Sequence, residues 1–219
     1  VKSSGKLNKG NDRQYDTAHT DRLDGDSLEG KTIIFLGSSV TYGSASGGES
    51  FVEYLQVRDG IIPVKEALSG TTLVDEDVRG RQSYVRRMKN IDRNIKADCF
   101  VCQLSTNDAS LKKELGTVSD SFEMKDFDVL TVAGAIEYII AYARETWNCP
   151  VMFYTGTRYK SNEYGKMVEL LKQIQQKWNI SRNISTVFGN PFSWNHFFLI
   201  CNAMHIINIG CRNIWIVLF

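Results

Sequence analysis

Four short segments of the chain carry the residue types that acyl transfer requires. A serine hydroxyl attacks a carbonyl carbon when a base takes its proton, and N–H groups stabilise the oxyanion that forms. The turn Gly37–Gly43 offers the hydroxyl of Ser39, and Gly70 offers a backbone N–H that a ligand can approach closely. Asn107 offers a side-chain amide, and His205 offers a titratable base.

Each segment also has a simpler interpretation when it is taken alone. A glycine-rich turn between a strand and a helix is often a plain turn or a phosphate cradle. Asn107 lies in Ser105-Thr106-Asn107-Asp108, which is typical of an Asx turn or a helix cap. A lone histidine beside apolar residues, such as His205, often has a structural role. A flavin- or phosphate-binding module built on 37–46 therefore stays open, although the Gly-Lys-Ser/Thr ending of a Walker loop is absent.

Taken together and in this order, the segments resemble the SGNH (GDSL-type) hydrolase family. The family has a Gly-Asp-Ser turn, a Gly after the second strand, a Gly-x-Asn-Asp turn and an Asp-x-x-His near the C-terminus. The first of these four features corresponds to Gly37-Ser38-Ser39, with Ser38 in place of Asp. The second feature corresponds to Gly70. The third corresponds to Ser105–Asp108 with Ser in place of Gly, and the fourth to Asn202–His205 with Asn in place of Asp.

The resemblance implies an ester hydrolase of flavodoxin-like architecture that uses neither a metal nor an organic cofactor. It makes Ser39 the nucleophile and His205 the general base. The N–H groups of Ser39 and Gly70 and the side chain of Asn107 would hold the oxyanion. Asn202 would stand where the family places the acid of the triad. Expected substrates are acetyl or short acyl esters of a small molecule or a carbohydrate.

Three further residues are expected near the substrate because they adjoin the same turns. Ser38 precedes the nucleophile, Asp108 follows Asn107, and Arg158 follows the fourth expected strand. Arg158 could equally belong to a surface loop with Tyr159, and the residue types alone favour the loop.

Asn202 is the main departure from the family pattern. An asparagine accepts a hydrogen bond but does not stabilise an imidazolium as a charge, and the same change in a serine protease costs about 10⁴ in kcat. No Asp or Glu follows Glu169, so residues 170–219 offer no local substitute. The sequence leaves three alternatives: a Ser–His dyad with a backbone or water partner, a diverged C-terminal tail, or a hydrolase-fold protein that binds an ester or glycan with weakened turnover.

Alternating strands and helices must position these residues. Short apolar runs predict strands at 31–36, 61–68, 99–104, 151–154 and 184–188. Helical spacing predicts helices from residue 51, over 84–91, 129–147, 163–178 and 203–217. This order predicts a three-layer α/β/α sandwich with a parallel five-stranded sheet, flavodoxin-like, over 31–219, preceded by a polar N-terminal arm at 1–30. Ligands of such sheets bind beyond the carboxyl ends of the strands, where the four segments fall.

Composition excludes several classes of protein. The 219 residues are 42% hydrophobic and 23% charged with a net charge of +1, so the chain is neither disordered nor charged in a way that favours nucleic acid or anionic lipid. No apolar run reaches the roughly 18 residues of a membrane-spanning helix. Five cysteines, an odd number, indicate a reducing compartment, and the polar start lacks a secretory core. We therefore expect a cytoplasmic protein, with secretion still open because the sequence begins without Met.

Other chemistry-bearing groups are weaker candidates. Cys99 and Cys102 have redox or metal spacing, but residues three apart on a strand face opposite sides. The acidic run 75–77 has no His or Cys beside it and reads as a solvated loop. His19 and His196 have no partner at a ligand spacing, so no metal site is predicted.

Overall fold

The sheet is parallel throughout the part of the chain that the computed structural model describes, residues 11–156 and 161–180. Its four strands in these ranges are β1 (Thr32–Gly37), β2 (Ile62–Ala67), β3 (Cys99–Gln103) and β4 (Val151–Tyr154), in the order β2-β1-β3-β4. The predicted α/β class with a parallel sheet is confirmed. The fifth strand expected at 184–188 and the helix expected at 203–217 lie outside the described residues.

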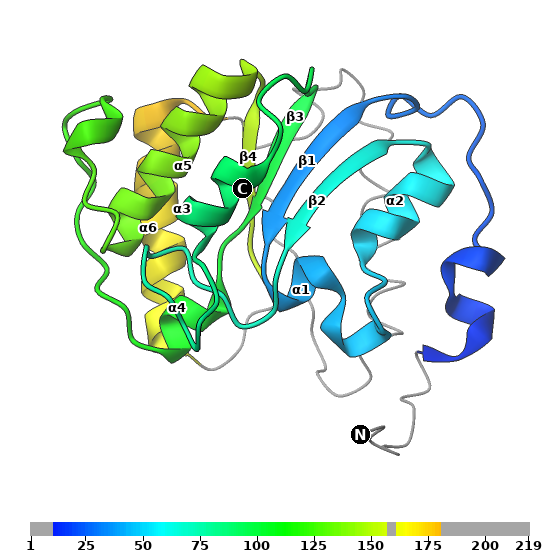
Figure 1. Ribbon diagram of the computed structural model, residues 1–219, viewed down its shortest axis with the longest axis horizontal. Coiled ribbons are helices and arrows are strands. Elements are labelled where there is room, and N and C mark those ends of the chain that lie inside the picture. The colour runs from blue at the N-terminus through cyan, green and yellow to red at the C-terminus, as the bar shows by residue number, and fades with distance from the viewer. Residues whose placement is uncertain (1–10, 157–160, 181–219) are drawn as a thin grey trace.

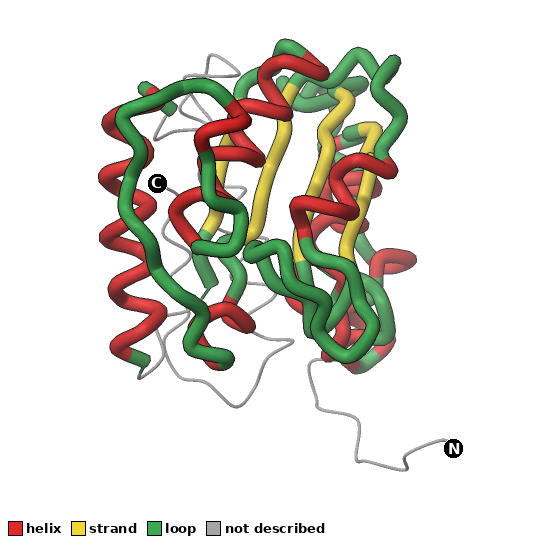
Figure 2. Tube along the Cα trace, turned by 60° about the vertical axis from the view of Figure 1, so that its left-hand side comes forward, coloured by secondary structure: helices red, strands yellow, loops and turns green. Residues whose placement is uncertain are grey.

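Helices cover both faces of this sheet, as Figures 1 and 2 show. One face carries α3 (Tyr84–Arg87), α5 (Val132–Trp147) and α6 (Asn162–Trp178), and the other carries α2 (Phe51–Asp59). The alternation of side chains along β1 explains both layers: Ile34 and Leu36 enter one hydrophobic cluster, whereas Ile33 and Phe35 enter the other. The three-layer arrangement follows because β1, β3 and β4 each contribute apolar side chains to both clusters.

The two long helices begin and end at residues suited to those positions. The hydroxyl of Thr131 accepts from the N–H of Gly134 (3.2 Å) at the start of α5, and that of Ser161 accepts from Tyr164 (3.1 Å) at the start of α6. Asn148 and Asn179 end these helices in the left-handed conformation. Both helices match their predicted ranges closely. None of the helices in the described ranges is long and apolar enough to cross a bilayer.

The helix predicted over 84–91 is shorter than expected. α3 ends at Arg87, and a 3-10 turn over Met88–Asn90 continues it. Two more short helices, α1 (Ser39–Tyr42) and α4 (Thr106–Ser110), follow β1 and β3 directly. Figure 1 shows α1 and α4 at the lower edge of the sheet, where the strands end. The predicted site segments of the first three turns therefore lie at one edge.

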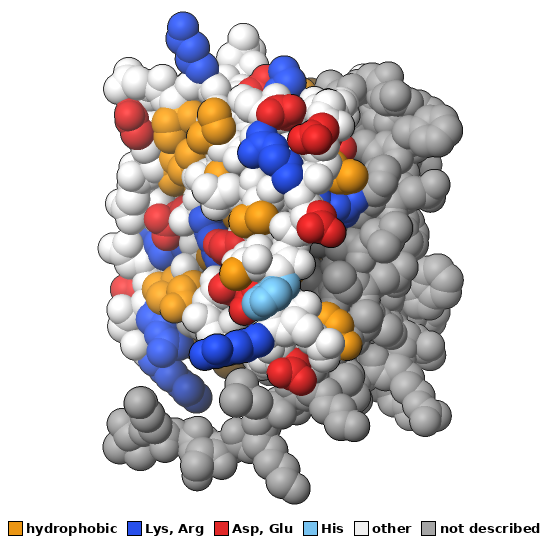
Figure 3. Space-filling model, turned by 90° about the vertical axis from the view of Figure 1, so that its right-hand side faces the viewer, with side chains coloured by type: hydrophobic (Ala, Val, Ile, Leu, Met, Phe, Trp, Pro, Cys, Tyr) orange, Lys and Arg blue, Asp and Glu red, His pale blue; other side chains and the backbone are white. Residues whose placement is uncertain are grey.

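The described part of the N-terminal arm lies along α2. The N–H of Leu23 donates to the carbonyl of Arg58 (2.7 Å), the hydroxyl of Tyr54 donates to the carbonyl of Tyr15, and Leu28 is buried. Figure 3 views this side of the molecule and shows Lys and Arg side chains intermingled with Asp and Glu. The domain boundary at residue 31 stays a prediction.

Candidate functional site

Ser39 is the first residue of α1, directly beyond the end of β1. It is partly exposed, whereas Ser38, which precedes the helix, is fully buried. In the part of the chain that the structure describes, no acceptor is paired with the N–H of Ser39 or of Gly70. The residue predicted as the nucleophile thus reaches the surface at the carboxyl edge of the sheet, and Ser38 is turned into the protein.

Gln103, at the end of β3, holds the nucleophile turn from beneath. Its buried Oε1 accepts from the backbone N–H of Ser38 (3.0 Å) and of Thr41 (3.3 Å) and from the Thr41 hydroxyl (2.9 Å). The Thr41 hydroxyl also lies 2.6 Å from the hydroxyl of Tyr154 on β4. Gln103 was not among the residues predicted from the sequence, where its one signal is a polar amide at the end of an otherwise apolar strand.

Gly37 allows this close packing. A Cβ at this position would lie 1.7 Å from the Thr41 hydroxyl oxygen and 3.0 Å from Oε1 of Gln103. A larger residue would therefore displace the first residues of α1 from β3. The glycine at the end of β1 is a packing requirement of the turn.

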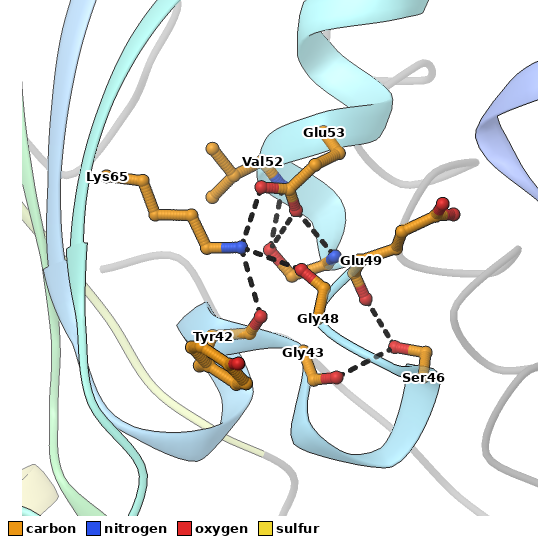
Figure 4. Close-up of polar contacts among 9 residues, drawn as sticks. Tyr42, Gly43, Ser46, Gly48, Glu49, Val52, Glu53 and Lys65 are labelled. Carbon is orange, nitrogen blue, oxygen red and sulfur yellow. Dashed lines mark hydrogen bonds and ion pairs between the residues drawn. The ribbon is translucent and has the colours of Figure 1, made fainter.

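Lys65 of β2 supports the segment that follows Ser39, as Figure 4 shows. Its Nζ donates to the carbonyls of Tyr42 (3.0 Å) and Gly48 (3.1 Å) and to the carboxylate of Glu53 (2.7 Å). Glu53 also accepts from the backbone N–H of Ser50 (2.7 Å), which completes the capping box of α2. One ammonium group thereby joins the end of α1, the following loop and α2. Nothing in the spacing of the sequence singled out Lys65.

The turn after β2 brings Gly70 beside the nucleophile turn. The N–H of Leu68 donates to the carbonyl of Gly37 (3.2 Å), and Gly70 has φ +79°. A side chain is disfavoured in this left-handed conformation, and a Cβ would lie 2.7 Å from Nη1 of Arg81. The backbone conformation therefore favours glycine at this position, and the role of its N–H as an oxyanion donor stays a prediction.

The turn after β3 contacts the turn after β2 through one carbonyl group. The side-chain amide of Asn107 donates to the carbonyl oxygen of Thr71 (2.8 Å), and the hydroxyl of Ser105 donates to the same oxygen (3.2 Å). Ser105, not Asn107, caps α4, because its hydroxyl accepts from the N–H of Asn107 (3.1 Å). An asparagine amide has two hydrogens, so its bond to Thr71 leaves one more for a ligand.

Asp108 has buried partners within the protein. Its carboxylate is fully buried and accepts from the N–H groups of Leu73 (2.9 Å) and Val74 (3.1 Å). Burial raises the pKa of Asp108 to about 6, and the two N–H groups offset only part of that effect. This places the carboxylate beneath the loop that follows Thr71 and gives it a supporting role there.

The remaining predicted site residues lie outside the described residues. These are His205, Asn202 and Arg158, with Tyr159 and His196. Their roles stay predictions that rest on the sequence pattern.

The weaker candidates occupy structural positions. Cys99 enters one hydrophobic cluster and Cys102 the other, on opposite faces of the sheet as their spacing predicts. Asp75 and Asp77 both pair with Arg86 (2.7 and 3.0 Å) at the surface. No group of three His, Cys, Asp or Glu suited to a metal occurs within residues 11–156 and 161–180.

The fold of the chain is similar to those of several solved proteins. A protein of Lactobacillus plantarum superposes with a TM-score of 0.56 at 15% identity, covering 84% of this chain and 100% of its own. A Bacteroides uniformis protein described provisionally as a GDSL-like lipase gives 0.50 at 17% identity, covering 69% and 81%. A Chitinophaga pinensis protein described provisionally as a lipase gives 0.51 at 17%, covering 74% and 69%. The chain shares the fold of these three proteins.

This likeness lies in the fold. The identities are low, and neither a family model nor a curated relative matches the sequence. In the structure the three predicted segments follow β1, β2 and β3, in the order that the resemblance implies.

Replacing Asp108 with asparagine tests the effect of burying its carboxyl group. Because the pKa of Asp108 is raised from 3.8 to about 6 on folding, its protonation stabilises the folded state at low pH, and this contribution is lost as the pH rises through about 6. Relative to Asp108→Asn, the wild-type free energy of unfolding is expected to increase by about 2 kcal/mol between pH 7 and pH 4. Urea denaturation of both proteins at each pH measures this difference. A difference that stays constant with pH would contradict the raised pKa.

Proposed function

We propose that the protein is a serine ester hydrolase that cleaves acetyl or short acyl esters through an acyl-enzyme. The observation that carries the proposal is the convergence of three turns at one edge of the sheet. The amide of Asn107 binds the carbonyl of Thr71, which directly follows Gly70, and Leu68 in the same turn binds Gly37 at the base of the nucleophile turn. A partly exposed serine, a left-handed glycine and an asparagine amide are thus neighbours.

In the proposed reaction, Ser39 Oγ attacks the carbonyl carbon of the ester while His205 accepts the hydroxyl proton. The carbonyl oxygen becomes an oxyanion, which the N–H groups of Ser39 and Gly70 and the amide of Asn107 stabilise. The alcohol leaves with the proton returned by His205, and the acyl group stays on Ser39. Water then attacks the acyl-enzyme, with His205 again serving as base, and the carboxylic acid is released.

The surrounding contacts supply preorganisation for this chemistry. Gln103 holds the backbone N–H groups of Ser38 and Thr41, and so sets the direction of the chain at Ser39. Asp108 holds the N–H groups of the loop that follows Thr71. Donors that are positioned before substrate binds need no reorganisation when charge develops, which is the main source of oxyanion stabilisation.

The expected substrate is a small-molecule or carbohydrate ester. A flavin- or phosphate-binding module is less consistent with the structure. Phosphate binding uses the dipole at a helix N-terminus, whereas α1 has four residues and ends at Gly43. A hydrolase fold with weakened turnover remains a second candidate, because Asn202 stands where the family has its acid. The two candidates differ in rate, not in the site they use.

Ser39→Ala is expected to reduce the rate of p-nitrophenyl acetate hydrolysis by about 10⁴- to 10⁶-fold, because it removes the group that forms the acyl-enzyme. The matched control is Ser110→Ala on α4, whose exposed hydroxyl bonds the carbonyl of Thr106 within its own helix (3.0 Å). Steady-state kinetics of both variants make the comparison. Equal rates for wild type and Ser39→Ala would remove Ser39 from the proposed role.

Asn107→Ala is expected to lower kcat by about 10²- to 10³-fold with a small change in KM, because the amide acts on charge that appears only in the transition state. Asn94→Ala is the control, since Asn94 is exposed, precedes β3 at the opposite edge of the sheet and bonds Asp92 (3.0 Å). A rise in KM at unchanged kcat would show that Asn107 binds substrate without stabilising an oxyanion.

Asn202→Asp is expected to raise the rate at least tenfold, because an aspartate stabilises the imidazolium that forms at His205. Asn94→Asp adds the same charge elsewhere and should leave the rate unchanged. An unchanged rate in Asn202→Asp would mean that another partner already orients His205. That result would contradict the hypothesis of a weakened hydrolase.

A further inference from the structure

Arg87, the last residue of α3, places a buried guanidinium group between the first two turns of the site. Its exposed fraction is 4%. Nη1 donates to the carboxylate of Glu66 on β2 (2.8 Å), and Nε donates to the carbonyl of Gln82 (3.3 Å). Nη2 donates to two acceptors, the carbonyl of Gly37 (2.8 Å) and the hydroxyl of Thr71 (3.0 Å). Arg87 was not among the residues predicted from the sequence.

A buried guanidinium group requires compensation, because removing its charge from water is unfavourable. Glu66 balances the charge, and each of the three donor nitrogens has an acceptor. The Tyr84 ring lies against the group, with its centroid 5.3 Å from Cζ. The group is therefore held in one orientation, and its planar fork determines where its acceptors lie.

The two acceptors of Nη2 belong to the two turns that the oxyanion site must bring together. Gly37 is two residues before Ser39, and its carbonyl also accepts from Leu68. Thr71 is the residue after Gly70, and its carbonyl accepts from Asn107. Ser39 is therefore two residues from Gly37, which accepts from Arg87, and Gly70 is one residue from Thr71, which also accepts from Arg87. The third proposed donor, Asn107, is hydrogen-bonded to Thr71.

We propose that Arg87 is a positioning residue for the oxyanion site, which holds the nucleophile turn and the Gly70 turn at the separation that the transition state requires. This inference rests on the proposed esterase function and adds to it the group that sets the spacing of its donors. Arg87 does not touch the substrate. Small displacements of catalytic groups lower rates strongly, about 10²-fold for a shift of about 1 Å.

Lysine cannot replace this guanidinium group in the same way. An ammonium group at the end of a flexible chain keeps the charge beside Glu66 but lacks the rigid fork that contacts Gly37 and Thr71 together. Thr71 offers an independent test of the same contact. Its hydroxyl accepts from Arg87 and donates to the carbonyl of Leu68 (2.7 Å), and Thr71→Val removes that hydroxyl at nearly constant volume.

The experiment measures kcat and KM for p-nitrophenyl acetate in Arg87→Lys, Thr71→Val and Thr71→Ser. Arg87→Lys should lower kcat about 10- to 100-fold with KM within about twofold of wild type. Thr71→Val should lower kcat about tenfold, and Thr71→Ser, which keeps the hydroxyl, should recover most of that loss. The control is Arg86→Lys on the same helix, because Arg86 is exposed and pairs with Asp75 and Asp77 at the surface.

The outcomes separate this inference from the proposed function. If wild type lacks Ser39-dependent hydrolysis, the proposed function fails and the role of Arg87 fails with it. If wild type is active and folded Arg87→Lys keeps kcat within twofold, or changes only KM, the positioning role alone is overturned. If Arg87→Lys does not fold, the Thr71 pair decides: equal kcat for Thr71→Val and Thr71→Ser overturns the inference, and the expected difference supports it.

Discussion

Thr71 is the residue through which the three turns of the site contact one another. Its carbonyl accepts from Ser105 and Asn107 of the turn after β3. Its hydroxyl accepts from Arg87, whose guanidinium group also binds the end of β1. Because Thr71, Ser105 and Arg87 are buried, each of their polar groups would be costly to leave without a partner. The relative placement of the turns therefore depends on buried hydrogen bonds, which are energetically unfavourable to break.

The parallel sheet makes this arrangement necessary as well as feasible. Parallel strands end at one edge, so the turns after β1, β2 and β3 must share a small region. Their backbone groups need partners that neighbouring strands cannot supply. Buried polar side chains from adjacent elements take that role: Gln103 under the nucleophile turn, Asp108 under the loop after Thr71, and Arg87 between the first two turns. The contacts that stabilise these turns are therefore the same contacts that would position the groups of the proposed reaction.

Most of the fold could be predicted from the sequence, because the signals are local. Apolar runs located the four described strands to within a residue or two, and helical periodicity located α5 and α6. The third turn was harder. Its residue types suit both a cap and an oxyanion donor, and only the structure separates the two roles, with Ser105 capping α4 and Asn107 reaching Thr71. α3 was expected to be longer than it is, because its apolar spacing continues through a 3-10 turn.

By itself, the sequence determined the α/β class, the order of the turns and the residue types at Ser39, Gly70 and Asn107 that suggest acyl transfer. Only the tertiary structure decided which ordinary residues support them. Gln103 meets Ser38 across 65 residues of sequence, and Arg87 meets Gly37 across 50. No local pattern carries such pairings, because they arise when parallel strands bring the ends of distant segments to one edge and bury the polar groups that meet there.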